Sequence, residues 1–230
     1  MQTDEKEQET IQENPDTPAE QQDEEKDSYS FKNFIADIMD IAEAAILTVF
    51  LFLLVFAYLL RPVTVDGGSM NPTLYDQDNL LILTSLPKPK NGQIIVMDNQ
   101  ISGRFIDDAQ TKVLESEGSG LILIKRLIAQ GGQEVDIDFE TGTVKVDGNV
   151  LDEPYIAALT TRNDGAFTYP FTVPEGYIFA MGDNRLNSTD SRNPAVSLIP
   201  EREILGTVLV RYDRDDELCA DWKDRFAFLF

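Results

Sequence analysis

A serine and a lysine are the residues of this chain whose surroundings best suit chemistry. Ser69 follows two glycines in the stretch VDGGSMNPTL, residues 65–74. Glycines reach backbone conformations closed to other residues and leave room for another chain to lie against them, which suits a nucleophile. The dipeptides GG and NP are also ordinary turn sequences, so a simple loop turn is the competing interpretation of this stretch.

Lys125 lies in an apolar run, LILIKRLI, at residues 121–128. If this run is a strand, alternate side chains share a face, and Lys125 points the same way as Leu123 and Leu127. Burial disfavours an ammonium ion and lowers the pKa of a lysine, so a neutral amine could act as a general base near pH 7. The alternative is that the side chain extends along its stem to solvent at a sheet edge.

The lack of histidine narrows the chemistry further. The 230 residues include no histidine and one cysteine, Cys219. An intrachain disulfide, a cysteine-rich metal site and every Ser-His or Cys-His pair within this chain are therefore excluded. A hydrolase with this sequence needs a base other than histidine.

A third stretch, GDNRLNSTDSR at residues 182–192, follows the apolar segment YIFAM. Solvated loops have this composition, which is the simplest explanation of it. Asp183, Arg185, Asp190 and Arg192 could also pair as planar carboxylate–guanidinium contacts that stiffen the loop. Rigid loops commonly support binding or catalytic sites.

The elements that must position these residues begin with an acidic tail. The formal net charge of the chain is -22, and residues 1–28 contain eleven Asp or Glu against two Lys. Residues 1–30 have too few large apolar groups to offset the entropy of ordering, so we predict a disordered tail. The acidic balance argues against nucleic acid as a partner, because a polyphosphate requires a basic surface.

An apolar segment of membrane length follows the tail. Residues 44–60, AAILTVFLFLLVFAYLL, contain no charge. As a helix they extend roughly 25 Å, near the thickness of a bilayer core, and we predict a transmembrane anchor over residues 35–61. A buried core helix is usually shorter, and a cleaved signal peptide needs a basic start and small residues at its end. Lys26 and Lys32 on one side, against Arg61 on the other, favour a cytoplasmic N-terminus.

The remainder of the chain is typical of short β-strands separated by turns. The β-like runs are residues 79–83, 93–97, 121–128, 134–137, 143–146, 177–181 and 205–211. Asp147-Gly148 is predicted to be a hairpin turn. No long helical pattern lies between these runs, so we predict a mainly β domain over residues 62–217. An apolar tail, residues 218–230, would either pack against this domain or rest on the bilayer.

In this order after a membrane helix, GGSMNPTL, LIKRLIAQGG and GDNRLNSTDSR resemble the type I signal peptidases. These are membrane-bound serine proteases that remove signal peptides from exported proteins. Weaker similarity in LPKPKNGQIIVM and VKVDGNVLDEPYI extends the resemblance over residues 40 to 212. The resemblance implies a signal-peptidase-like β-barrel or β-sheet catalytic domain behind one anchor, as in Gram-positive bacteria.

The resemblance also implies roles for individual residues. Ser69 would be the nucleophile and Lys125 the general base of a Ser-Lys dyad, with the Ser69 N–H in the oxyanion hole. The Ser188 hydroxyl would help to orient the lysine. The other implied supporting residues are Gly67, Gly68, Met70, Pro72, Asp183, Asp190 and Arg192. Some members carry a hydroxyl side chain at the position of Gly67, so the second oxyanion donor is left open here.

Three segments depart from the family pattern. Asn91-Gly92-Gln93 stands where members often have Arg-Gly-Asp, and Gly131-Gly132-Gln133 where they have Pro-Gly-Asp. Residues 98–120 form a longer insertion than expected, with no function that the sequence assigns. These residues support the site rather than take part in the reaction, so the departures affect the expected loop geometry more directly than the expected activity.

The implied function is removal of N-terminal signal peptides from exported preproteins through an acyl-enzyme. Substrates would carry small residues at the first and third positions before the cut. The resemblance implies no metal and no organic cofactor, with preproteins and the lipid bilayer as partners and the secretion machinery as a further candidate. It implies a single-pass cell-membrane protein with an extracytoplasmic catalytic domain.

Two other classes compete with this function. One is a catalytically silent, membrane-anchored peptide-binding protein on the same fold. The other is a self-cleaving Ser-Lys repressor, which is disfavoured because an acidic and then apolar segment stands where its DNA-binding domain would be.

Overall fold

The computed structural model describes residues 31–84, 88–212 and 226–229. The predicted acidic tail, residues 1–30, and Cys219 lie outside the described residues. Contacts divide the chain into two units, residues 1–47 and 48–230, and the sheets and the site described below belong to the second.

Helix α1 (Phe31–Tyr58) contains the predicted anchor and runs from the first unit into the second. It is long and apolar enough to cross a membrane, and none of its residues is buried, unlike a core helix. The helix ends earlier than the predicted residue 61, because strand β1 (Leu60–Thr64) begins almost at once. Pro62 disfavours helical backbone at Arg61, and both residues pair with β2 instead.

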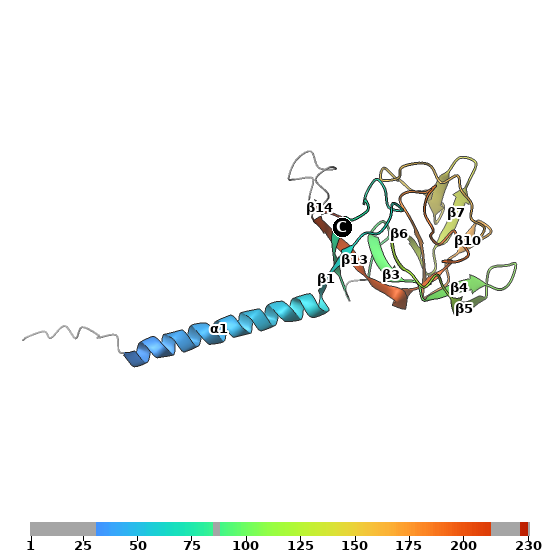
Figure 1. Ribbon diagram of the computed structural model, residues 1–230. Helices are drawn as coiled ribbons and strands as arrows, with labels where there is room; N and C mark the ends of the chain where they lie inside the picture. The colour runs from blue at the N-terminus through green and yellow to red at the C-terminus, as the bar shows by residue number, and fades with distance from the viewer. Residues whose placement is uncertain (1–30, 85–87, 213–225, 230) are drawn as a thin grey trace, which may run out of the picture. The chain divides into compact units, whose positions relative to one another are not determined.

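An antiparallel sheet of eight strands forms the body of the second unit (Figure 1). Its order is β1-β2-β13-β3-β6-β11-β12, and β14 pairs with β13. The bounds of the strands after β1 are β2 (Asn79–Leu83), β3 (Ile94–Asp98), β6 (Ile122–Gln130), β11 (Tyr177–Met181), β12 (Ile199–Pro200), β13 (Ile204–Tyr212) and β14 (Ala227–Phe228). A single 3-10 turn, η1 (Glu201–Glu203), joins β12 to β13. The long strand β6 therefore lies inside the sheet, between β3 and β11.

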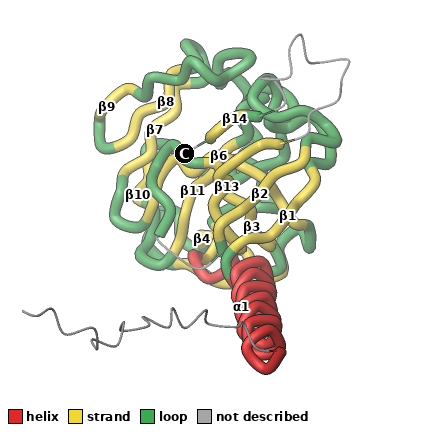
Figure 2. The backbone as a smooth tube through the Cα atoms, turned by 90° about the vertical axis from the view of Figure 1, so that its left-hand side faces the viewer, coloured by secondary structure: helices red, strands yellow, loops and turns green. Residues whose placement is uncertain are grey.

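Two smaller sheets complete the unit, and Figure 2 shows β7 to β10 grouped at one side of it. The first sheet has the order β10-β7-β8-β9, and the second is a hairpin of β4 and β5. Their bounds are β4 (Ile101–Phe105), β5 (Val113–Glu117), β7 (Glu134–Asp138), β8 (Thr143–Val146), β9 (Asn149–Val150) and β10 (Phe171–Thr172). The insertion at residues 98–120 is thus the β4–β5 hairpin, which a bridge between Gly103 and Leu198 ties to the rest of the unit.

Buried side chains gather in three clusters, two of which lie beside the site. One cluster contains Leu80, Ile82 and Ile94 and receives Met70 and Leu74 from the turn after β1. A second contains residues of β3, β6 and β11. The third joins the sheets through stacked aromatic rings, with Phe167 and Phe171 centroids 4.3 Å apart. Burial of these apolar groups holds β1, β6 and the loop after β11 in fixed relation.

The mainly β prediction is confirmed, and each predicted run overlaps a strand. The turn at Asp147-Gly148 is also confirmed, with φ of 52° and 74° as a tight hairpin turn requires. The described part of the C-terminal segment is not a separate tail, because β14 pairs with β13. Leu229 packs against the cluster that contains Met70, while Phe226 and Phe228 are exposed.

Candidate active site

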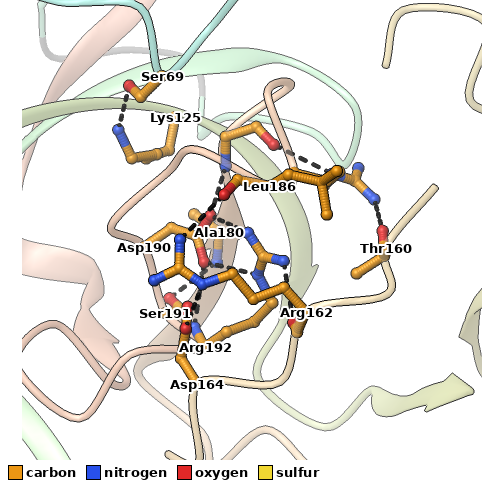
Figure 3. Close-up of polar contacts among 12 residues, drawn as sticks. Ser69, Lys125, Thr160, Arg162, Asp164, Ala180, Leu186, Asp190, Ser191 and Arg192 are labelled. Carbon is orange, nitrogen blue, oxygen red and sulfur yellow. Dashed lines mark hydrogen bonds and ion pairs between the residues drawn. The ribbon is translucent and has the colours of Figure 1, made fainter. Parts of the chain in front are cut away.

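Ser69 and Lys125 meet although 56 positions separate them in the chain. Ser69 lies in the turn that follows β1, and Lys125 lies within β6. The Lys125 Nζ is 2.8 Å from the Ser69 Oγ and donates to the Ile124 carbonyl at 2.9 Å. Figure 3 shows the two side chains pointing toward each other. This distance allows direct proton transfer between the hydroxyl and the amine.

The lysine is buried and does not reach solvent at a sheet edge. Only 3% of Lys125 is exposed. Strand β3 pairs with this part of β6, and the amine lies against the Ser69 hydroxyl and the Ile124 carbonyl. Burial lowers the pKa of Lys125 to about 8, although the carboxylates of Asp190 and Asp183 oppose this shift. A pKa of 8 leaves about a tenth of the amine neutral at pH 7, compared with less than a thousandth for an ordinary lysine.

The turn that carries Ser69 is built from a glycine in a left-handed conformation and two buried anchors. Gly67 has a φ of +87°, which L side chains rarely adopt, and its N–H donates to the Asp76 Oδ1 at 2.8 Å. Met70 and Leu74 are buried in the core behind the turn. Ser69 itself is half-buried, so its hydroxyl faces an accessible space.

The other two motif residues of this turn differ in their surroundings. A Cβ at Gly68 would stand 3.0 Å from the Asn71 side chain, so a larger residue would press on the turn. Pro72 is exposed, and no hydrogen bond of the described structure joins it to Ser69 or Lys125.

The loop of residues 182–192 supports the site through buried ion pairs. Asp190 pairs with Arg192 as predicted, at 2.8 Å and 2.9 Å. The prediction that Asp183 and Arg185 also pair within the loop is wrong. Asp183 accepts two bonds from Arg126, the neighbour of Lys125 in β6, at 2.8 Å and 2.6 Å.

Arg185 also leaves the loop for its partner. It pairs with Glu153 at 2.5 Å and is fully buried. Tyr155 covers the guanidinium of Arg126 at 3.8 Å from its ring centroid. Glu153 and Tyr155 belong to the stretch DEPYI, which the sequence comparison included without a role. An acidic and an aromatic residue so close together in this stretch were the signal that could have pointed to partners for buried arginines.

Ser188 lies at the heart of the same loop but does not bond to the lysine. It is 3% exposed, and among the described residues the amine bonds to Ser69 and Ile124 rather than to the Ser188 hydroxyl. Burial raises the pKa of Asp190, but the Arg192 guanidinium and the Gly182 N–H, which both bond to this carboxylate, outweigh it, and the net pKa is lowered. The Ser188 hydroxyl is buried and makes no hydrogen bond within the described residues.

Gly182 is a site residue that sequence reasoning overlooked. A Cβ built there would stand 2.5 Å from the Ser69 carbonyl oxygen and would collide with the Ser188 hydroxyl. Only a hydrogen fits between the two serines. The glycine therefore sets how closely the loop approaches the nucleophile.

A cleft of 640 Å³ opens beside Ser69. It is lined by residues 63–70, by residues 121–125, and by Asn187 and Thr189. The first part of β6 pairs with β3 but not with β11, whose pairing begins at Arg126. The cleft thus borders two backbone edges, and in the described part of the chain no cluster of three or more acidic, Cys or His side chains could hold a metal there.

Three comparisons relate this chain to known proteins. A family model described as "Signal peptidase, peptidase S26" matches residues 38–212. A signal peptidase I of Bacillus amyloliquefaciens is 35% identical over 172 residues, which cover 72% of this chain and 80% of that protein. Signal peptidase I T of Bacillus subtilis is 33% identical over 175 residues, with the same coverage. A crystal structure of a signal peptidase I from Enterococcus faecalis is 26% identical and covers 54% of this chain and 98% of its own, with a TM-score of 0.36.

Proposed function

Because the chain belongs to the signal peptidase family, peptidase S26, we propose that it cuts signal peptides from exported preproteins with a Ser69–Lys125 dyad. The observation that carries this proposal is the 2.8 Å contact between the Lys125 Nζ and the Ser69 Oγ. Together with the lowered pKa of Lys125, it supplies a nucleophile and a base in a chain without histidine.

The reaction begins with proton transfer from Ser69 to neutral Lys125. The serine oxygen attacks the scissile carbonyl, the lysine returns the proton to the leaving amine, and an ester to Ser69 remains. Water, deprotonated by the same lysine, then releases the acyl group. Burial of the amine is what makes this base available, because it removes water that would stabilise the ammonium form.

The oxyanion of the intermediate requires hydrogen-bond donors near Ser69. The Ser69 N–H makes no hydrogen bond within the described chain, so it is available to donate to the oxyanion. The Gly67 N–H is already bonded to Asp76, and Gly67 has no hydroxyl. The oxyanion hole therefore depends strongly on the orientation of a single backbone N–H.

The cleft suits an extended substrate. A peptide could add as a strand between residues 63–68 and the free edge of residues 121–125, with its backbone bonded on both sides. The glycines at positions 67 and 68 leave space for the scissile segment next to Ser69. Small residues at the first and third positions before the cut fit this arrangement, because alternate side chains of an extended peptide face the same wall.

Helix α1 would hold the domain at the membrane surface. We propose a single-pass protein with a cytoplasmic N-terminus, a catalytic domain of residues 62–217 outside and the bilayer and preproteins as partners. Membrane anchoring places enzyme and inserted substrate in one plane and raises their effective concentration.

Cleavage of a peptide that ends its signal segment in Ala-x-Ala tests the proposal, with the protein in detergent. We expect cutting after the second alanine, identified by mass spectrometry, and its loss in Ser69→Ala and Lys125→Met. Lys145→Met is the matched control, because Lys145 is a surface lysine paired with Asp136. Binding of the peptide without cleavage by the unmodified chain would support the silent binding protein instead.

A further inference from the structure

The Asn184 side chain and backbone both bond to the segment that carries Ser69. The Asn184 Nδ2 donates to the Gly68 carbonyl at 3.0 Å, and the Asn184 N–H donates to the Ser69 carbonyl at 3.0 Å. Asn184 comes from the loop after β11, 115 positions from Ser69. One residue therefore holds the two peptide units that flank the nucleophile.

The bond to Gly68 also determines where the Ser69 N–H points. The peptide unit is planar, and in its trans form the carbonyl of Gly68 and the N–H of Ser69 point in opposite directions. The described cis bonds are Asn71-Pro72 and Tyr169-Pro170, so the Gly68-Ser69 unit is trans. The Gly68 carbonyl also accepts from the Asn71 N–H at 3.2 Å inside the turn, and the shorter bond from Asn184 holds it from outside the turn. Together these two donors fix the Ser69 N–H on the opposite side, and a hydrogen bond to the carbonyl also polarises the N–H.

Asn184 is itself held rigidly by its neighbours. Asp183, on one side, is fully buried, bonds twice to Arg126 and accepts from the Thr73 hydroxyl at 2.5 Å. Arg185, on the other side, is fully buried and pairs with Glu153. The amide of Asn184 is consequently a fixed donor rather than a mobile surface group.

We infer that Asn184 is a positioning residue of the oxyanion hole. It acts through the Gly68-Ser69 peptide unit, so that the N–H of Ser69 is directed at the developing oxyanion before the reaction starts. The inference rests on the proposed function. It explains how this chain can stabilise an oxyanion although Gly67 supplies no hydroxyl.

Asn184→Ala removes the side-chain donor and keeps the backbone N–H. Removing an oxyanion donor outright costs about 100- to 1000-fold in kcat, so loss of the group that orients it should cost about 10- to 100-fold. The loss should appear in kcat with KM nearly constant. Among the described residues the Lys125 amine bonds to Ser69 and Ile124 and not to Asn184, so the midpoint of the pH dependence should stay where it is in the unmodified protein.

Two further measurements separate positioning from a purely structural role. The affinity of an Ala-x-Ala peptide aldehyde, which forms a tetrahedral adduct, should fall by the same factor as kcat/KM. The affinity of the uncut substrate, measured in a Ser69→Ala background with and without Asn184→Ala, should change less than about two-fold.

Asn149→Ala is the matched control, because the Asn149 amide bonds to the Asp147 carbonyl in an exposed turn. Thermal unfolding establishes that each variant is folded, and Asn184→Asp, which keeps the size and loses the donor, decides the matter if Asn184→Ala does not fold. A folded variant with kcat/KM within about two-fold of the unmodified protein would refute the role of Asn184, as would an equal loss of ground-state affinity. Absence of cleavage by the unmodified chain would instead refute the proposed function.

Discussion

The pH dependence of cleavage follows directly from the buried lysine. Burial lowers the pKa of Lys125 to about 8, and the amine is the base only when it is neutral. The neutral fraction is about 1% at pH 6, about 9% at pH 7 and about 90% at pH 9. We therefore expect kcat/KM to rise about tenfold per pH unit below 8 and to level above it, with a gain of roughly 90-fold between pH 6 and pH 9.

The assay is cleavage of the Ala-x-Ala peptide at substrate concentrations well below KM, in detergent, from pH 5.5 to 10. The chain has no histidine, so a rise in kcat/KM near neutral pH cannot come from titration of a histidine side chain. An unperturbed lysine would give a midpoint near 10.5 and no plateau in this range. A midpoint near 10.5, or a rate independent of pH between 6 and 9, would refute the assignment of Lys125 as a base activated by burial.

Three further predictions concern stability and packing. The pKa of Lys125 is lower in the folded than in the unfolded chain, so the unfolded chain binds more protons between about pH 8 and 10.5. The free energy of unfolding should therefore rise with pH in that window by about 3 kcal/mol through this group. The difference in this free energy between the unmodified protein and Lys125→Met, measured by denaturant unfolding, should show the rise, and a difference that does not change with pH would contradict it. Gly182→Ala should lower kcat by about 100-fold, because the added methyl group displaces the Ser69 carbonyl. Gly148→Ala, in an open turn, should cost about 1 kcal/mol of stability and leave activity unchanged. Equal activity of the two variants would refute this packing argument. Glu153→Leu should destabilise the fold by about 3 to 5 kcal/mol, because the buried Arg185 guanidinium loses its carboxylate partner. Glu115→Leu, at an exposed pair with Arg202, should cost less than about 1 kcal/mol. Similar shifts of the unfolding temperature in both variants would contradict this prediction.

The sequence was sufficient for the strands with a strong apolar pattern but not for the short strands, for β1 or for the β4–β5 hairpin. Runs such as residues 79–83 and 177–181 match β2 and β11 because alternating or continuous apolar residues give a strong local signal. The short strands β9, β10, β12 and β14 have two residues each, so tertiary pairing rather than local pattern defines them. The β4–β5 hairpin was overlooked because its strands are half exposed and contain charged residues.

The candidate site was predictable where residue type decides it and unpredictable where long-range pairing does. Lys125 in an apolar run indicated either a buried amine or a side chain that reaches solvent at a sheet edge, and the structure shows the buried amine. The partners of Asp183 and Arg185 could not be predicted, because Arg126 and Glu153 lie 57 and 32 positions away in the chain. Gly182 and Asn184 were overlooked because their roles depend on contact with the Ser69 turn, which only the folded chain creates.

The central claim is that Ser69 and Lys125 act as one unit, and a double-mutant cycle in kcat/KM tests it most directly. Ser69→Ala, Lys125→Met and the double variant are compared with the unmodified protein on the Ala-x-Ala peptide, after thermal unfolding shows that each is folded. The account predicts that each single variant loses nearly all activity and that the double variant loses no more, because either change removes the whole dyad. Losses that add in free energy, or substantial cleavage by folded Lys125→Met, would contradict it.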